Sequence, residues 1–362
     1  IPEGVRGFQF SFNLTERYNG KGGVGMKALV LQAPGQLIMK EVPKPVLGAD
    51  ELLIKTKAAT ICTSDLHDIE YNPFGIKLPM IMGHEGAGVV EAVGEGVTDF
   101  KTGDEVAAHP VIPCRVCESC KRGLEHLCDN MGHLGIDRGG AFAEYFTIRQ
   151  DRARKKPASL SFAESTLMEP VCVCIEALER ANMKDGNSIL IIGDGPFGIL
   201  MSRLCKVYKD AKVILLGRHP FRMERAGNAI TINERTSDNP LAEVMKATDG
   251  KGVDSAVLCV GTNQALDLAV AALRPRGTLS VFSAIAGRPT IDMFKVHVKE
   301  LNICGSCNDM NYLDRALEYL QDEELNLKEV ITHQLPFDRF EEAFRLVSKG
   351  KDSALKVSLI FE

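Results

Sequence analysis

Residues 188–198 read SILIIGDGPFG, in which an apolar run of strand character passes directly into a turn with three glycines. A helical pattern follows from 196 to 208. This order is typical of the first βα unit of a dinucleotide-binding domain, because glycines permit the tight turn and the close approach of a pyrophosphate to the helix N-terminus. The flanking strand and helix favour this interpretation over a glycine-rich turn without a ligand. The residues assigned to the cofactor here are Gly193, Gly195, Pro196, Phe197 and Gly198.

Strands and helices continue to alternate beyond this unit, to about residue 304. Alternation of this kind predicts an α/β fold with a doubly wound parallel sheet, covered by helices on both faces. The predicted strands are 188–192, 212–216, 255–260, 278–282 and 301–304, and the predicted helices are 196–208, 240–248, 263–273 and 292–299.

The second strand, 212–216, ends without the acidic residue that hydrogen-bonds the ribose 2′-hydroxyl in NAD-binding domains. Gly217 stands at this position, and Arg218 and Arg222 follow it. A glycine leaves room for a 2′-phosphate, and an arginine binds it through paired donors. The pattern favours NADP(H) over NAD(H), with these three residues as cofactor ligands. In the alternative, the arginines only face solvent and another residue supplies the acid.

The rest of the chain differs from this α/β region. From 26 to about 160, short β-branched runs are separated by glycine and proline, which predicts a β-rich, barrel-like domain. Residues 161–181 have helical spacing, with Ser161 or Ser159 as the cap. The last 58 residues mix helix and strand, and we expect them to rejoin the first domain.

A chain of 362 residues is long enough for two domains. We predict a catalytic domain of residues 26–175 with 305–362, and a nucleotide domain of residues 176–304. Residues 1–25 are glycine-rich and have no clear period, so we interpret them as a leader or an added extension.

Composition excludes several classes of function. Hydrophobic residues make up 45% and charged residues 25% of the chain, the balance of a globular protein. The net charge is −5 with no block of basic residues, so neither a nucleic acid nor a membrane surface is an expected partner. No apolar run reaches the roughly 18 residues that a membrane-spanning helix needs. Eleven cysteines without an export signal indicate reduced thiols in the cytoplasm, some of them as metal ligands.

Four cysteines are spaced C-x2-C-x2-C-x7-C among charged residues and glycine. Four thiolates so close in sequence can surround one zinc ion tetrahedrally and leave no open position, so the metal would be structural. Scattered buried thiols or two disulfides are the less favoured alternative. The predicted ligands are Cys114, Cys117, Cys120 and Cys128. Cys172 and Cys174 are expected in the core, with a place in the active site as the alternative.

A second metal site is suggested by Cys62, His84 and Glu169, which lie in three separate segments. A thiolate, an imidazole and a carboxylate would give zinc three protein ligands and one open position. Each residue alone is weak support, because a lone histidine is more often a core or surface group and a glutamate before proline more often marks a turn.

The order of these motifs resembles that of the zinc-dependent medium-chain dehydrogenase/reductase family over residues 26–362. The resemblance rests on GHEGAG at 83–88, with Cys62 before it and the four cysteines after it. The pair Glu169-Pro170 is similar to the sorbitol and threonine dehydrogenase branch. The resemblance implies a GroES-like β-rich catalytic domain, a Rossmann domain, an active site in the cleft between them, and two zinc ions per chain.

The same resemblance implies residue roles. Cys62, His84 and Glu169 would bind catalytic zinc, the last directly or through water, and Glu85 would assist ligand exchange or bind the metal itself. Ser64 would accept the proton of the substrate hydroxyl and His67 would pass it to solvent, because zinc makes a bound alcohol more acidic. For His67, a surface histidine is the alternative.

The predicted reaction is reversible oxidation of a secondary alcohol to a ketone with NADP+. A polyol, cyclitol or sugar-derived alcohol is the first choice, although CND at 307–309 replaces an arginine–tyrosine pair that similar polyol dehydrogenases can carry, which argues against sorbitol itself. The alternatives are an amino alcohol such as threonine, a simple alcohol, or a non-catalytic NADPH-binding zinc protein. Similar enzymes are commonly dimers or tetramers, so we expect a homo-oligomer.

Overall fold

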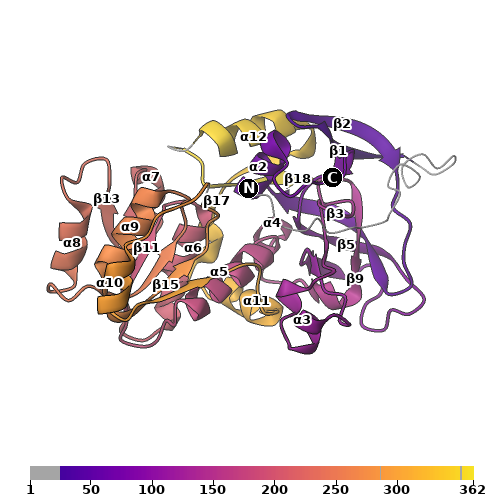
Figure 1. Ribbon diagram of the computed structural model, residues 1–362. Helices are drawn as coiled ribbons and strands as arrows, with labels where there is room; N and C mark the ends of the chain where they lie inside the picture. Colours follow the sequence, from indigo (N-terminus) through magenta and orange to yellow (C-terminus); the bar gives the residue numbers. More distant parts are fainter. Residues whose placement is uncertain (1–24, 286, 351–352) are drawn as a thin grey trace.

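The structure is a computed structural model that describes residues 25–285, 287–350 and 353–362. Two lobes lie side by side, a nucleotide-domain lobe and a β-rich lobe (Figure 1). The predicted leader, 1–25, lies outside the described residues except for Gly25, which begins the first strand. Among the described residues, no helix combines the length and apolar character needed to cross a membrane.

In the described residues the nucleotide domain contains one parallel sheet, as predicted, with six strands, one more than the five predicted. The strand order is β13 (Ile230–Asn233), β12 (Lys212–Gly217), β11 (Ser188–Ile192), β14 (Val253–Leu258), β15 (Leu273–Val281), β16 (Asn302–Gly305). The order runs outward from β11 in both directions, so it reverses between β11 and β14. Ligands of such sheets bind in the crevice beyond the carboxyl ends of the strands at this reversal.

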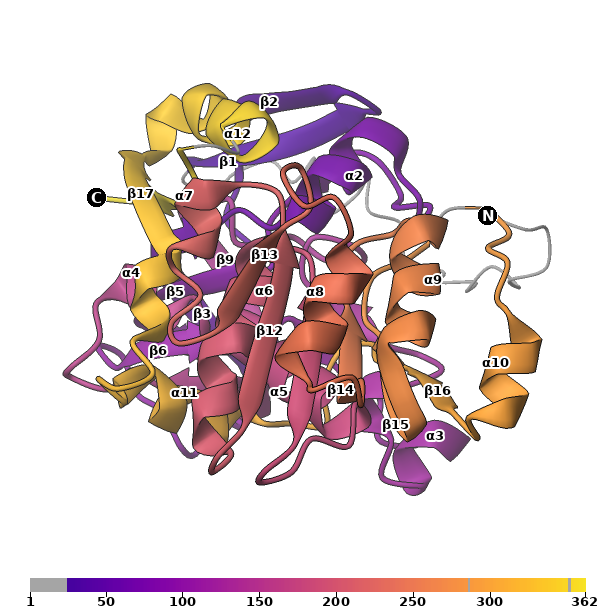
Figure 2. The same cartoon turned by 90° about the vertical axis from the view of Figure 1, so that its left-hand side faces the viewer.

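Both faces of this sheet are covered by helices, which explains why its central strands are apolar throughout. Ile189 and Ile191 of β11 pack in one core cluster with α5 and α6, whereas Leu190 and Ile192 pack in another with α8 and α9. Figure 2 shows α8 and α9 lying along the sheet. The helices of this part of the chain are α5 (Met168–Arg180), α6 (Pro196–Leu204), α7 (Pro220–Met223), α8 (Pro240–Ala247), α9 (Asn263–Ala272) and α10 (Met293–Val298).

In the part of the chain that the structure describes, the β-rich domain contains three sheets. β2 (Gln36–Pro43), β1 (Gly25–Ala33) and β4 (Met80–Ile81) form one, and β7 (Val111–Ile112) pairs with β8 (Gly132–His133). The largest has the order β10 (Ala153–Lys155), β6 (Glu105–Ala108), β5 (Glu85–Val93), β3 (Glu51–Thr60), β18 (Lys356–Ile360), β17 (Ile331–Pro336), and β9 (Tyr145–Arg149) also pairs with β3.

The end of the chain completes this sheet. β18 pairs antiparallel with β3 and parallel with β17, so strands from the two ends of the sequence are neighbours (Figure 1). Helix α5 continues through the domain boundary that we predict at 175/176, and both predicted boundaries stay predictions. The remaining C-terminal elements are α11 (Leu313–Gln321), η4 (Leu327–Val330), η5 (Phe337–Arg339) and α12 (Phe340–Lys349).

Several short segments differ from the sequence prediction. Helix α2 (Thr63–Tyr71) lies in the region predicted as all β, and β13 is a strand that no predicted range includes. In α4 (Phe162–Ser165), Ser161 is the cap, since its hydroxyl accepts the N–H of Glu164 at 3.2 Å. The other short helical turns are α3 (Glu118–Lys121), η1 (Glu125–Leu127), η2 (Gln150–Arg152) and η3 (Cys205–Val207).

Candidate active site

A thiol, an imidazole and a carboxyl group meet inside the β-rich domain. They belong to Cys62, His84 and Glu85, which are all buried and whose ligand atoms lie within 4.8 Å of one another. Cys62 is the N-cap of α2, His84 immediately precedes β5, and Glu85 is the first residue of β5. The fold therefore brings together two of the three residues predicted as catalytic metal ligands, and places Glu85 beside them.

Asp65 holds Cys62 and His84 in position. Its Oδ2 accepts the backbone N–H of Cys62 at 2.8 Å, and its Oδ1 lies 3.2 Å from Nδ1 of His84, which leaves Nε2 of His84 for a metal. Burial alone lowers the pKa of His84, but Asp65 and Cys62 outweigh it and raise the pKa well above its usual value. The same negative groups favour a metal cation. Asp65 is not among the predicted site residues. The sequence signal that could have found it is its position three residues after Cys62, the N-cap of α2, where capping-box residues lie.

Glu169 lies in the first turn of α5 and is the third predicted ligand. Its carboxyl group is not one of the ligand atoms, those of Cys62, His84 and Glu85, that lie within 4.8 Å of one another. Among the described residues its buried Oε2 has no hydrogen-bond partner, and burial, together with the charge of Glu85, raises its pKa to about 8. A buried carboxyl oxygen without a partner, near a thiol and an imidazole, fits a metal ion or a water bound to one.

Glu85 is held by two side chains that are absent from the predicted set. Nζ of Lys356 lies 2.5 Å from Oε1 of Glu85, and the hydroxyl of Thr60 donates to Oε2. Lys356 is 1% exposed and Glu85 is fully buried. The ammonium of Lys356 also lies 5.8 Å from the centre of the Phe197 ring, so this pair connects the metal ligands with the glycine-rich turn. Lys356 comes from β18, far away in sequence, which is why spacing alone does not reveal it.

Ser64 and His67 occupy one face of α2, since residues three apart on a helix are neighbours. Ser64, next to the buried Cys62, is half-buried, and His67 is exposed. This arrangement is compatible with a proton path from the metal ligands to solvent.

A second imidazole lies beside His84. The ring centres of His84 and His133 are 5.7 Å apart, and Nδ1 of His133 lies 2.7 Å from the carbonyl oxygen of Leu134. Burial, followed by the charge of His84, lowers the pKa of His133 to about 3, so this ring is neutral near pH 7. His133 has no predicted role.

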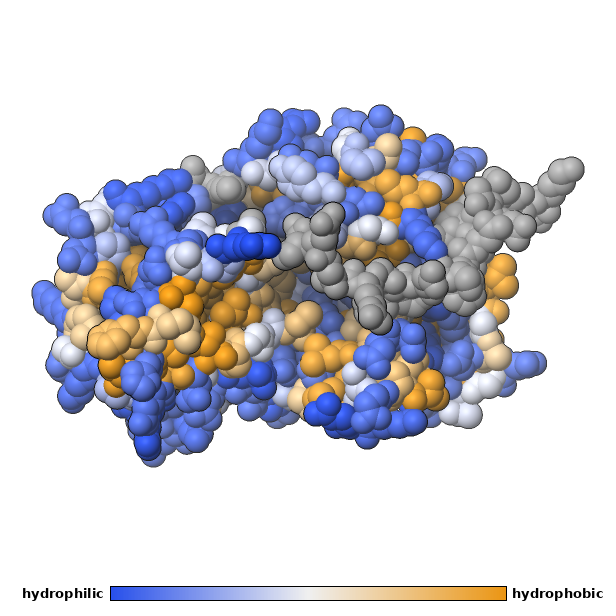
Figure 3. Space-filling view, viewed as in Figure 1, coloured by the Kyte–Doolittle hydropathy of each residue, from blue (hydrophilic) through white to orange (hydrophobic). Residues whose placement is uncertain are grey.

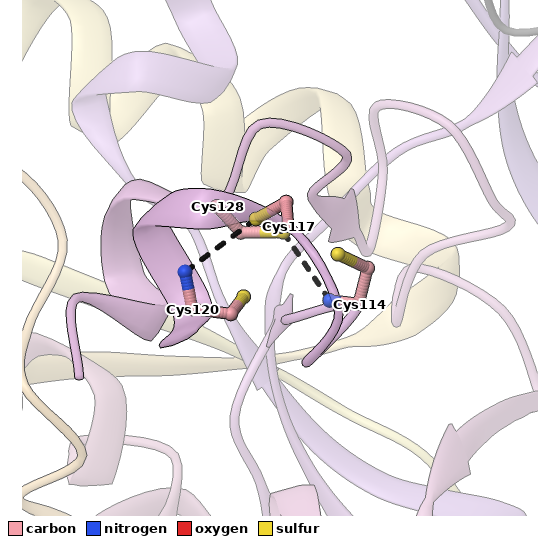
Figure 4. A group of neighbouring side chains, drawn as sticks. All are labelled: Cys114, Cys117, Cys120 and Cys128. Atoms are coloured by element: carbon pink, nitrogen blue, oxygen red, sulfur yellow. Dashed lines mark hydrogen bonds between the residues drawn. The ribbon is translucent and has the colours of Figure 1, made fainter. Parts of the chain in front are cut away.

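The four clustered cysteines converge in the lobe formed by α3 and η1 (Figure 4). All four sulfur atoms lie within 4.8 Å of one another, and Sγ of Cys117 is 3.8 Å from Sγ of Cys128. The backbone N–H of Cys114 donates to Cys128 at 3.2 Å, and that of Cys120 donates to Cys117 at 3.5 Å. All eleven cysteines of the chain are free thiols. This donor set fits a tetrahedral zinc ion.

A third group of metal-ligating side chains, His109, Cys172 and Asp309, is also buried. Nε2 of His109 lies 2.6 Å from Asp309, and Arg152 donates to Nδ1 of His109 at 2.6 Å. Asp309 also accepts backbone N–H groups, the first from Asn311 at 2.8 Å. Because protein groups already satisfy both ring nitrogens and a guanidinium supplies the positive charge, this group is a buried polar network. Cys172 is fully buried here.

The glycine-rich turn joins β11 to the N-terminus of α6, next to the reversal of strand order. Gly193 has φ of +120°, and its N–H donates to the carbonyl of Leu216 at 2.8 Å. A Cβ on Gly198 would lie 1.8 Å from the oxygen of Gly193, so only glycine fits there. Gly195 is the N-cap of α6, and Pro196 is in the first turn. Unpaired N–H groups at such a helix start suit a pyrophosphate.

An acidic residue does lie beside Gly217, but it comes from the glycine-rich turn. A Cβ on Gly217 would be 2.7 Å from the Cβ of Asp194. Oδ2 of Asp194 accepts the N–H groups of Arg218 and His219, each at 2.6 Å, and lies 3.1 Å from Nδ1 of His219. The sequence left open that a residue other than the one at position 217 supplies the ribose-binding acid, and Asp194 is such a residue. Its Oδ2, however, already accepts hydrogen bonds from protein groups.

The two predicted arginines point to different places. The exposed guanidinium of Arg218 pairs with Glu234 at 2.6 Å, close to Gly217. The buried guanidinium of Arg222 donates to the carbonyl of Ala354, at 3.0 and 3.2 Å. A further arginine, Arg235, lies 3.3 Å from Nε2 of His219 and is not among the predicted residues.

Two family profiles match this chain: the alcohol dehydrogenase GroES-like domain over residues 48–158, and the zinc-binding dehydrogenase over residues 196–322. The sorbitol dehydrogenase of Bacillus subtilis (strain 168) is 34% identical over 344 residues, which cover 92% of this chain and 96% of that protein. The L-threonine 3-dehydrogenase of Pyrococcus horikoshii is 37% identical over 341 residues, which cover 90% and 96%.

Solved structures agree with these relatives. A short chain alcohol dehydrogenase of E. coli CFT073 complexed with NADH has a TM-score of 0.87 and 28% identity, and covers 94% of this chain and 100% of its own. A zinc-binding dehydrogenase of Sinorhizobium meliloti 1021 bound to NADP has a TM-score of 0.85 and 25% identity, and covers 93% and 99%. The expected fold class, a GroES-like domain with a Rossmann domain, is confirmed. The chain is an enzyme with zinc-type alcohol dehydrogenase chemistry and belongs to the zinc-dependent medium-chain dehydrogenase/reductase family.

Proposed function

We propose that this enzyme interconverts a secondary alcohol and its ketone with NADP(H), using Cys62, His84 and Glu169 as the ligands of a catalytic zinc. The observation that carries this proposal is the buried group of Cys62, His84 and Glu85, in which Glu85 is paired with Lys356 close to the nucleotide turn. The four clustered cysteines are proposed to hold a second, structural zinc. Zinc, when bound, supplies a Lewis acid that makes an alcohol easier to deprotonate, and the nicotinamide, when bound, accepts the hydride.

The chain's own side chains have separate tasks in this proposal. Asp65 orients His84 and the backbone of Cys62, while Lys356 and Thr60 restrain Glu85 next to the metal ligands. Ser64 accepts the hydroxyl proton of the substrate. His67, one turn further along α2 and exposed, releases it to solvent.

The preference for NADP(H) is supported by Gly217 and by the cations Arg218 and Arg235 near the end of β12. NAD(H) is the competing candidate, because the carboxylate of Asp194 lies where a ribose-binding acid is usual. Dissociation constants of NADPH and NADH for wild type, Arg218→Ala and Asp194→Asn separate the two. NADP(H) predicts tighter NADPH binding that Arg218→Ala weakens. Tighter NADH binding that only Asp194→Asn weakens supports the competitor.

A polyol, cyclitol or sugar-derived alcohol is the proposed substrate class, and an amino alcohol such as threonine fits the relatives equally well. The test is nicotinamide reduction over a panel of polyols, cyclitols, threonine and simple alcohols, with NADP+ and NAD+ in parallel. Turnover of threonine or simple alcohols alone would leave the zinc chemistry in place and remove the substrate class. Protein with two zinc ions that oxidises no alcohol would contradict the reaction.

We also propose a homo-oligomer in a reducing compartment such as the cytoplasm. Apolar side chains gather over α10 and the edge strand β16, where Met293, Phe294 and Val298 are 54–73% exposed (Figure 3). Exposed apolar patches at an open sheet edge are typical of subunit contacts. Light scattering of wild type and of Phe294→Asp measures the mass, and a monomeric wild type would contradict the oligomer.

The free state of all eleven cysteines supports the proposed reducing compartment.

A further inference from the structure

His133 is the chemically active side chain near the metal ligands that the proposed mechanism does not use. It ends β8, where it pairs with Val111 of β7. Its backbone N–H donates to Oδ1 of Asp137 at 2.5 Å, and its carbonyl accepts the N–H groups of Ile136 and Asp137, each at 3.2 Å. The backbone of His133 is therefore fixed by strand pairing and a closed turn, and a side chain on such a rigid base keeps its direction.

The hydrogen bond to Leu134 determines which ring nitrogen of His133 carries the proton. A carbonyl oxygen can only accept, so Nδ1, 2.7 Å from the oxygen of Leu134, must be the protonated nitrogen. A neutral imidazole has one N–H, and Nε2 is then an acceptor. Among the residues that the structure describes, no protein group donates to Nε2.

The ring also lies beside His84, one of the proposed metal ligands. Its centre is 5.7 Å from that of His84, the planes are tilted by 57°, and the residue is only partly buried. An acceptor that is partly withdrawn from water and lacks a protein partner gains most from a ligand that brings a donor.

We propose that His133 determines substrate specificity, with Nε2 accepting a hydrogen bond from a donor on the carbon next to the one that is oxidised. The inference rests on the proposed function and names its substrate class as a vicinal diol unit, as in polyols and cyclitols. A vicinal ammonium group, as in threonine, is the other donor of this kind. We commit to the hydroxyl, because burying an ammonium costs far more free energy than burying a neutral hydroxyl.

The experiment uses matched substrates and matched variants. 2,3-Butanediol and 2-butanol differ by one hydroxyl, as do 1,2-cyclohexanediol and cyclohexanol, and threonine forms the third arm. His133→Asn keeps a donor for Leu134 but has no atom at Nε2, whereas His133→Gln can place its amide oxygen near Nε2. We expect His133→Asn to lower the ratio of kcat/KM for diol over monoalcohol by about 3- to 10-fold. His133→Gln should restore part of it.

Two further measurements separate this role from others. Calorimetry should show weaker binding of the diol to His133→Asn, and zinc content should stay equal to that of wild type. A ratio that stays the same in both variants, or a loss of zinc in His133→Asn, would overturn the inference while the enzyme still oxidises alcohols. A preference for threonine that only His133→Asn abolishes would overturn the hydroxyl assignment. A wild type that oxidises none of these substrates would overturn the proposed function as well.

Discussion

The two candidate zinc sites differ in how the chain supplies their ligands. The structural site takes all four from residues 114–128, in a lobe with only short helical turns. The candidate catalytic site would take Cys62 from the cap of α2, His84 from the turn before β5 and Glu169 from α5. A short loop closes at small entropic cost, whereas distant ligands meet only after the domain has folded. In the lobe the proposed zinc would stabilise the chain, whereas at the candidate catalytic site the folded chain, through Asp65 and Lys356, positions the proposed ligands.

The largest expected effect is on stability, from Cys117→Ser in the lobe. Structural zinc contributes about 10–16 kcal/mol in zinc-finger peptides, as much as or more than the net stability of a typical domain. We therefore expect a strongly lowered Tm or insoluble protein, with the loss of one zinc per chain. Calorimetric unfolding and metal analysis measure both. Cys307→Ser changes an exposed cysteine outside both sites and is the control; an unchanged Tm for Cys117→Ser would remove the distinction between the sites.

Cys62→Ser should show the opposite pattern, with a large loss of activity and a small change in Tm. Loss of the catalytic zinc removes several kcal/mol of transition-state stabilisation, so we expect kcat/KM to fall by about 10⁴-fold. Metal analysis should find one zinc instead of two. If Tm falls as far as in Cys117→Ser, the catalytic site also supports the fold and the comparison fails.

Lys356→Met tests whether protein groups hold the candidate catalytic site together. Removing the ammonium leaves the fully buried Glu85 with the hydroxyl of Thr60 but without its cationic partner, and breaking such a pair costs about 3–5 kcal/mol. Urea unfolding measures this loss. Adding Glu85→Gln should recover most of it, because the neutral amide does not need the lysine. Equal stability of the single and double variants would show that the two residues are not coupled.

The smallest effect concerns Asp65→Asn. The variant keeps the size of the side chain but weakens its hold on His84 and Cys62, and such partners of metal ligands typically affect metal affinity by about 10- to 100-fold. Competition with a chelator measures the affinity of each site. Only the catalytic zinc should be released more readily; equal release from both sites would place Asp65 outside the catalytic site.

The fold and the lobe could largely be predicted because their signals are local. The run 188–198 contains its own strand, turn and helix start, and the four cysteines lie within one loop. Helix α2 was harder to predict, because its first turn depends on a capping contact between Cys62 and Asp65 and its surroundings read as β. The position of Asp194 could not be predicted for a similar reason. Its motif predicts a nucleotide-binding turn, but not that its side chain reaches Gly217 at the end of β12.

The sequence by itself determined the alternation of strands and helices and the candidate residues for the two proposed metal sites. These depend on hydrophobic periodicity and residue chemistry, which act over a few neighbours. Only the tertiary structure decided which groups meet: β18 pairs with β3 in the large sheet and so brings Lys356 to Glu85, and β8 brings His133 beside His84. Such contacts join residues far apart in the chain, and the packing of complete sheets, which no local pattern records, decides their geometry.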